Sequence, residues 1–220
     1  MNDHIAPPAP VPTPRPMDGA ARFAVGALAL AGASWAVRAI WEIRLAVAGE
    51  PASGPPDQGN GAHRTLTGLE NQYHLVVSAC GVAVVICAVA FIGWLGRARD
   101  TARELSGKRP RYSGLWVYLG WVVPVVNLWF PRGIVAEVHR DSAPGERLPR
   151  SVNVWWALWL IGLLSGVGLM SADSTDQIIA RAYTNVGTLL VSDAAIVGAA
   201  VAGVFVVRAL SRNVSSRRSG

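Results

Sequence analysis

Four apolar runs of about twenty residues or more dominate the pattern of hydrophobic and polar positions along the chain. They lie at about 21–47, 75–95, 152–170 and 186–210. An α-helix rises about 1.5 Å per residue, so about twenty apolar residues are enough to cross a hydrocarbon core of about 30 Å. The pattern therefore predicts an all-α integral membrane protein whose fold is a four-helix transmembrane bundle.

A fifth apolar stretch, at about 115–131, differs from the other four because two prolines and an asparagine lie within it. As a helix, the part from Leu115 to Phe130 would be about 24 Å long, which is short of a full crossing. Pro124 removes a backbone donor from the middle of the stretch, and Pro131 ends it. We expect a re-entrant or interfacial hairpin on the cytoplasmic side; an ordinary proline-kinked span is the alternative.

The positive charges outside the four apolar runs help to decide between these two topologies. If the fifth stretch crosses the membrane, nine arginine and lysine residues lie on each side. If it returns to its own side, sixteen lie on one side and two on the other. Cytoplasmic loops carry the excess of basic residues in membrane proteins. The count therefore favours four spans with both termini cytoplasmic, and it explains the basic excess without a nucleic-acid partner.

The composition leaves no room for a sizeable soluble domain. Hydrophobic residues make up 51% of the chain and charged residues 15%, whereas about a quarter of a soluble domain is charged. We expect a transmembrane domain at 21–211, a disordered Pro-rich cytoplasmic tail at 1–20 and a basic cytoplasmic tail at 212–220.

The segments between the apolar runs carry further signals. The basic segment 97–111 is expected to continue the second span as a helix, to break at Gly107 and Pro110, and to contact anionic headgroups at the cytoplasmic face. The stretch 133–140 is typical of a short amphipathic helix at the cytoplasmic surface, and the stretches 48–72 and 171–185 are interpreted as outer loops. Six tryptophans are expected to act as anchors near the cytoplasmic interface: Trp94, Trp116, Trp121, Trp129, Trp155 and Trp156.

One set of residues resembles a known family. The basic RARD after the second apolar run is followed by a W-x-x-P-x-x-N-x-x-x-P pattern and by a WW pair at Trp155 and Trp156. The members of that pattern are Trp121, Pro124, Asn127 and Pro131. In these features the chain resembles the bacterial domain-of-unknown-function 4328 family over about 21–210. The resemblance implies a multi-span membrane protein with no assigned activity, and it brings no catalytic residues.

Ionisable groups inside the apolar runs are the main candidate site, because they are costly in a bilayer. The first run holds Arg38, Glu42 and Arg44, and the last holds Asp193. Counted from the outer ends of their helices, Arg38 and Asp193 lie at about 15 Å and 12 Å depth. One hypothesis is that Asp193 pairs with Arg38 or Arg44 in a cluster with Glu42. The alternative is that Arg38 and Glu42 pair with each other while Arg44 and Asp193 extend outward.

Other polar and small residues have two interpretations each. The Asn127 amide either caps backbone groups freed by Pro124 or contacts a polar ligand or ion. Gly162 and Gly166 form a G-x-x-x-G pattern that permits close helix approach, either within one bundle or between two copies.

No pattern predicts catalysis, a cofactor or a metal site. Cys80 and Cys87 are too far apart on one helix to form a disulfide, and the four histidines have no metal-ligand spacing. We therefore expect a non-enzymatic scaffold or accessory subunit of the bacterial cell envelope. Its expected partners are membrane lipids and either a second copy or another membrane protein. The alternative is a small oligomeric transporter or channel, in which the hairpin and the charged cluster line a polar path.

Overall fold

The computed structural model describes residues 17–59, 61–107, 121, 126–170 and 174–219. Over these residues the chain is helical and has no strands, apart from one isolated bridge between Asp57 and His63. The elements are α1 (Met17–Ala48), α2 (Gly68–Ser106), η1 (Val126–Leu128), α4 (Phe130–Ser142), α5 (Arg150–Met170), α6 (Thr175–Thr184) and α7 (Val186–Ser219). The predicted all-α class is confirmed.

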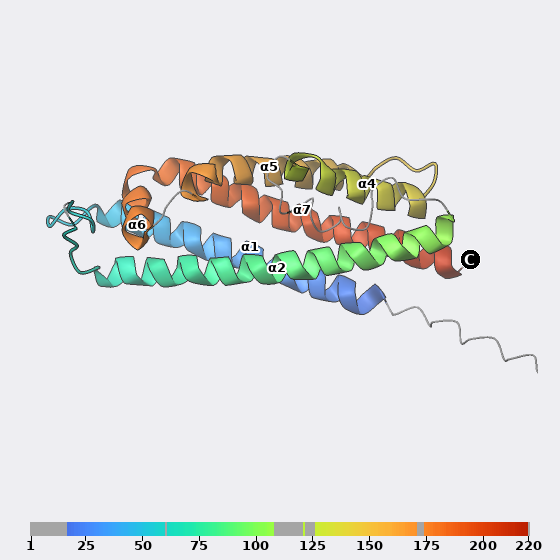
Figure 1. Cartoon of the computed structure of the whole chain (residues 1–220), viewed down its shortest axis with the longest axis horizontal. Coiled ribbons are helices and arrows are strands. Elements are labelled where there is room, and N and C mark those ends of the chain that lie inside the picture. Colours follow the sequence, from blue (N-terminus) through green and yellow to red (C-terminus); the bar gives the residue numbers. More distant parts are fainter. Residues whose placement is uncertain (1–16, 60, 108–120, 122–125, 171–173, 220) are drawn as a thin grey trace, which may run out of the picture.

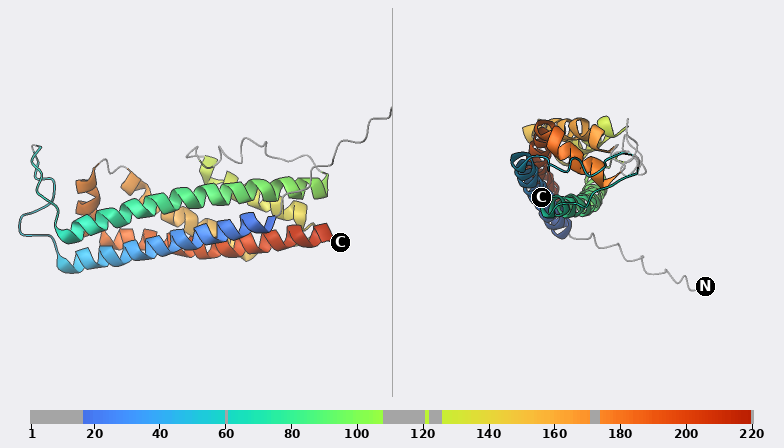
Figure 2. Two further views of the ribbon diagram at one scale, coloured as in Figure 1. Left: turned by 90° about the horizontal axis from the view of Figure 1, so that it is seen from below. Right: turned by 90° about the vertical axis from the view of Figure 1, so that its left-hand side faces the viewer.

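Four long helices, α1, α2, α5 and α7, lie side by side along one axis (Figure 1). α1 packs against α2 and α7, and α7 packs against α5. α6 and the connection between α1 and α2 lie at one end of the bundle, here called the α6 end (Figures 1 and 2). α4 lies with the C-terminal ends of α2 and α7 at the opposite end, here called the α4 end (Figure 1). Successive long helices therefore alternate in direction.

Three of the helices found in the described part are long and apolar enough to cross a membrane. They are α1, α2 and α7, over Asp18–Ala48, Gly68–Ser106 and Val186–Ser216. The remaining predicted span coincides with α5, which has 21 residues and is therefore about 31 Å long. Its crossing of the bilayer stays a prediction.

α2 is longer at both ends than the apolar run inside it. It begins at Gly68, where Thr67 Oγ1 accepts a hydrogen bond from the Glu70 backbone N–H at 3.3 Å and the Thr67 N–H donates to Glu70 Oε2 at 2.7 Å. This capping box satisfies two backbone donors at the start of the helix. The predicted loop 48–72 was therefore too long, because the polar first turn of α2 was assigned to it. The helix ends as expected at Gly107, which has a φ of 63°.

Two further segments differ from the sequence-based expectation. The segment 171–185 is not wholly a loop, because it contains α6, which is capped by Ser174 and buries Ile179 and Ala182. Short amphipathic helices of this kind gain their stability from tertiary packing rather than from intrinsic propensity. The basic residues after position 210 continue α7 to Ser219.

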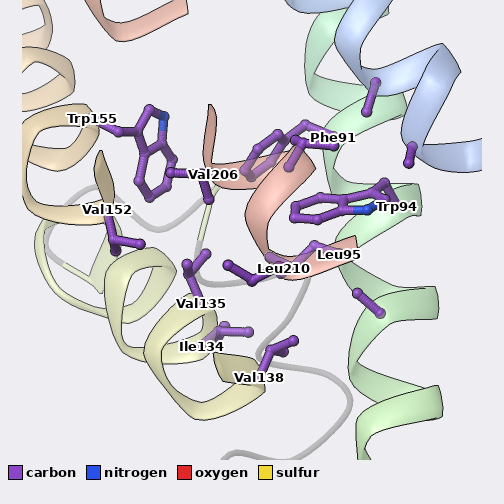
Figure 3. Packing of buried hydrophobic residues seen from close by; sticks show 14 of the residues in the cluster. Phe91, Trp94, Leu95, Ile134, Val135, Val138, Val152, Trp155, Val206 and Leu210 are labelled. Atoms are coloured by element: carbon purple, nitrogen blue, oxygen red, sulfur yellow. The ribbon is translucent and has the colours of Figure 1, made fainter. Parts of the chain in front are cut away.

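The largest hydrophobic cluster joins α4 to the long helices (Figure 3). Ile134, Val135 and Val138 on the inner face of α4 point toward α2, α5 and α7. The predicted amphipathic helix at 133–140 is therefore confirmed, with the difference that protein covers its apolar face. The cluster also includes Phe91, Trp94, Leu95, Val152, Trp155, Val206 and Leu210.

Three of the six tryptophans expected to be anchors instead lie in this core. Trp94 is fully buried, and its indole N–H donates to Ser211 Oγ at 3.0 Å. Trp155 and Trp156 are also buried, and they contact each other with ring centroids 5.6 Å apart. The expectation of lipid anchors was wrong for these three because their rings pack between helices. Trp129, by contrast, is exposed.

Candidate functional site

Three of the four predicted intramembrane charges meet in the half of the bundle nearer the α6 end. Arg38 Nε donates to Glu42 Oε1 at 2.8 Å, and Arg38 Nη2 lies 3.5 Å from Asp193 Oδ1. The Tyr73 hydroxyl of α2 donates to the same Glu42 oxygen at 3.1 Å. We call these four residues the ion cluster. They link α1, α2 and α7, and all four are buried.

Helix geometry explains why α1 presents both charges to its neighbours. Arg38 and Glu42 are four residues apart, so they lie on one face of the helix and bond each other. Trp35, one turn earlier, places its ring 4.4 Å from the Arg38 guanidinium carbon, which adds a cation–π contact. Burying these charges is costly, and the cost is offset only where charged and hydrogen-bonding partners are close. Arg38 has such partners on two helices.

The structure combines the two pairings that the sequence left open. Arg38 contacts Glu42 on its own helix and Asp193 on α7. Asp193 does not extend outward, because only 1% of its surface is exposed. Arg44 is not part of the ion cluster: it is exposed and lies over the Trp41 ring at 4.8 Å. Six residues after Arg38, it projects from a different side of α1.

Sequence reasoning missed Tyr73 as a member of the ion cluster. The apolar run was taken to begin at 75, which placed Tyr73 in the preceding loop. The Thr67–Glu70 capping box would have placed it inside a helix, five residues after the start of α2.

One cavity between the helices borders the ion cluster, and a second shares Trp35 and Trp159 with the first. The larger, of about 280 Å³, is lined by Arg38, Tyr73 and Ser192 together with apolar side chains. The smaller, of about 110 Å³, is lined mainly by apolar residues from α1, α2, α5 and α7 and by Trp121. Most of the lining is apolar, and its polar groups are Arg38, Tyr73 and Ser192 in the larger cavity, the indole N–H groups of the lining tryptophans, and the Cys87 thiol.

A second polar network closes the α6 end. Arg64 forms two hydrogen bonds to the carboxylate of Glu70, at 2.8 and 2.6 Å, and the Tyr183 hydroxyl of α6 donates to Glu70 Oε1 at 3.1 Å. The hydrogen bonds to Glu70 raise the pKa of the Arg64 guanidinium. Burial, together with the charge of Glu70, raises the pKa of Tyr183 to about 12. Glu70 thus ties α6 to the start of α2.

The residues of the predicted hairpin are described only in part. Pro124 and most of 115–125 lie outside the described residues, so the hairpin stays a prediction. Trp121 is half-buried and packs edge-on against Phe91 of α2 and Trp159 of α5. Asn127 lies in η1, where no hydrogen bond to its Oδ1 is found within the described part of the chain. Pro131 is buried in the first turn of α4.

Gly162 lies in the contact between α5 and α7 of the same chain. A Cβ atom placed on it would come 2.4 Å from Ile196 Cδ1, and one placed on Gly198 of α7 would come 2.9 Å from Leu158 Cδ1. The glycine of each helix thus faces a large side chain of the other. Ser192 Oγ also donates to the Gly162 carbonyl at 3.2 Å. Gly166 lies near the end of α5, beyond the residues whose packing is described.

These features define a class: an all-helical protein with apolar, membrane-capable helices and a buried ion cluster between them. A family model described as "Domain of unknown function (DUF4328)" matches residues 63–212, and the chain belongs to this family. The predicted family is confirmed over a region that starts after α1. It therefore includes Tyr73 and Asp193 but not Arg38 and Glu42. No curated protein and no solved structure matches the chain.

Proposed function

We propose that the protein is a four-span scaffold or accessory subunit of a bacterial plasma membrane, without enzymatic activity, and that its α4 end faces the cytoplasm. The alternating direction of the four long helices supports an even number of crossings. The extent of α5, close to the thickness of a hydrocarbon core, supports its role as the remaining span.

The charge distribution supports the orientation. Exposed arginines are concentrated toward the α4 end, on α2, α4, α5 and α7 and in the connection between α4 and α5, where they are suited to anionic headgroups or to an acidic partner. They are Arg97, Arg103, Arg140, Arg147, Arg150, Arg208 and Arg212.

The observation that carries the scaffold proposal is the mutual pairing of the buried charges. Arg38 is held by Glu42 and Asp193, so the most costly groups in the apolar region bind helices to one another. The neighbouring cavities are lined mostly by apolar side chains among the described residues. This arrangement suits a fixed bundle better than a polar path.

Topology is tested by labelling single cysteines from outside intact cells with a membrane-impermeant maleimide, in a background without Cys80 and Cys87. Ser53 and Gln177 are exposed at the α6 end, and Glu146 and Ser215 are exposed at the α4 end. We expect Ser53→Cys and Gln177→Cys to be labelled, and Glu146→Cys and Ser215→Cys to react only after the membrane is opened. Labelling of Glu146→Cys in intact cells would mean that the chain crosses once more between α2 and α4.

The alternative function is a small oligomeric transporter or channel, and the polar patch of the larger cavity favours it. A flux assay separates the two. We expect liposomes that contain the purified protein to leak protons, sodium and potassium no faster than empty liposomes. A flux that appears with the protein and is lost in Asp193→Asn, but kept in Asp176→Asn at the exposed α6 end, would support transport and contradict the scaffold.

A further inference from the structure

The charges of the ion cluster do not balance if every group is ionised. Glu42 and Asp193 supply two carboxyl groups, whereas Arg38 supplies one guanidinium. Both carboxyl groups are buried, with 0% and 1% of the residue surface exposed. An uncompensated negative charge inside an apolar bundle is strongly unfavourable. One further positive charge would make the cluster neutral.

The geometry indicates where that charge belongs. The carboxyl groups of Glu42 and Asp193 both lie against the one guanidinium of Arg38, with oxygens 2.8 and 3.5 Å from its nitrogens. Within the described part of the chain, Glu42 Oε2 and both oxygens of Asp193 have no hydrogen-bond donor, and the nearest cation to Asp193 is Arg38 at 3.5 Å. Two buried carboxyl groups beside a single guanidinium are not both expected to stay ionised, because one negative charge would remain uncompensated. A proton there would also supply the missing donor.

The hydroxyl and thiol groups around the pair are already engaged. On α2, the Tyr73 hydroxyl donates to Glu42 Oε1, and the Cys80 thiol donates to the Ser34 carbonyl at 3.2 Å. On α7, the Ser192 hydroxyl donates to the Gly162 carbonyl of α5. Within the described residues, the ion pairs of Glu42 and of Asp193 are both with Arg38. Arg38 is therefore the single cation available to two carboxyl groups there.

We propose that Glu42 and Asp193 form an intramembrane proton-binding site, in which the two carboxyl groups share one proton at neutral pH beside Arg38. The larger cavity is roomy enough for water and is lined by Arg38 and Tyr73, which contact the pair. A monovalent metal ion would balance the charge equally well. It is disfavoured because the guanidinium repels it and because only three oxygens are left without a donor, fewer than hard cations usually take.

The proposal goes beyond the scaffold function and does not depend on which end of the bundle faces the cytoplasm. Infrared spectroscopy of the full chain in liposomes tests it, because a protonated carboxyl group has its own carbonyl band, which shifts in heavy water. In sodium-free and potassium-free buffer at neutral pH we expect this band in the wild type. We expect it to be lost in both Glu42→Gln and Asp193→Asn, because the remaining carboxyl group then pairs with Arg38 and ionises. Asp176→Asn is the control and should keep the band.

Thermal unfolding of the same samples guards against variants that fail to fold. Each single amide variant keeps one carboxylate against Arg38, so its midpoint is expected to stay within a few degrees of the wild type. The double variant leaves Arg38 without a counter-charge and is expected to unfold at a clearly lower temperature. The proposal of a shared proton is overturned if the wild type lacks the band of a protonated carboxyl group. It is also overturned if that band survives in either single variant. Stabilisation of the wild type by added sodium or potassium, with loss of the band, would assign the site to a metal ion instead.

Discussion

Replacing Arg38 with methionine is expected to destabilise the protein by about 3–5 kcal/mol, the usual loss when one partner of a buried ion pair is removed. Methionine keeps an unbranched chain beside Trp35 but leaves Glu42 and Asp193 together without a cation. The loss should appear as a lower thermal midpoint in detergent and as less folded protein in the membrane fraction. Acidic pH should make this loss of stability smaller, because protonation of both carboxyl groups removes their repulsion.

Arg44→Met is the matched control for this variant. Arg44 lies on the same helix and also over a tryptophan ring, but it is exposed and outside the ion cluster. Its replacement should change stability by no more than about 0.5 kcal/mol. Equal effects of the two substitutions would show that the ion cluster contributes nothing to stability.

Replacing Gly162 with leucine is expected to cost about 3 kcal/mol, at the upper end of the usual range for overpacking. Even the first carbon of the new side chain would overlap Ile196, and the rest would push α5 away from α7. The change in stability should be measured from unfolding of the purified protein. Since α5 packs against α7, we also expect easier proteolysis near the ends of α5.

Two further variants show whether the cause is the contact itself. Gly81→Leu places the same side chain on α2, where nothing lies within 4 Å of the added Cβ, and should have little effect. Combining Gly162→Leu with Ile196→Ala exchanges the large and small sides of the contact and should recover part of the loss. If Gly81→Leu is as harmful as Gly162→Leu, loss of glycine rather than helix packing is responsible.

Features set by local sequence were predicted well. The end of α2 followed from the glycine at 107, and the amphipathic α4 followed from the spacing of apolar residues at 133–140. The similar level of Arg38 and Asp193 along the bundle, where they lie 3.5 Å apart, followed from the rise of the helix. Each of these depends on distance along the chain or along a helix axis, which sequence specifies directly.

Features set by packing around the bundle axis were not predictable in the same way. Hydropathy does not say which helices are neighbours, so it could not separate Arg38, which faces α7, from Arg44, which is exposed. It also did not reveal α6, whose ten residues are too polar to stand out and which is stabilised by packing near Tyr73. Trp94 and Trp155 looked like anchors for the same reason, since composition does not distinguish a lipid-facing ring from a buried one.

The charged residues of the ion cluster are divided between α1 and α7, and this has a consequence for biosynthesis. The chain emerges from the ribosome in order, and about 150 residues separate Arg38 from Asp193. Protein synthesis proceeds at about 5–20 residues per second, so Asp193 is added roughly 8–30 s after Arg38. The bond from Arg38 to Glu42 lies within α1, so the nascent helix neutralises its own charge during that interval. The first helix can therefore enter the bilayer before the last one has been translated.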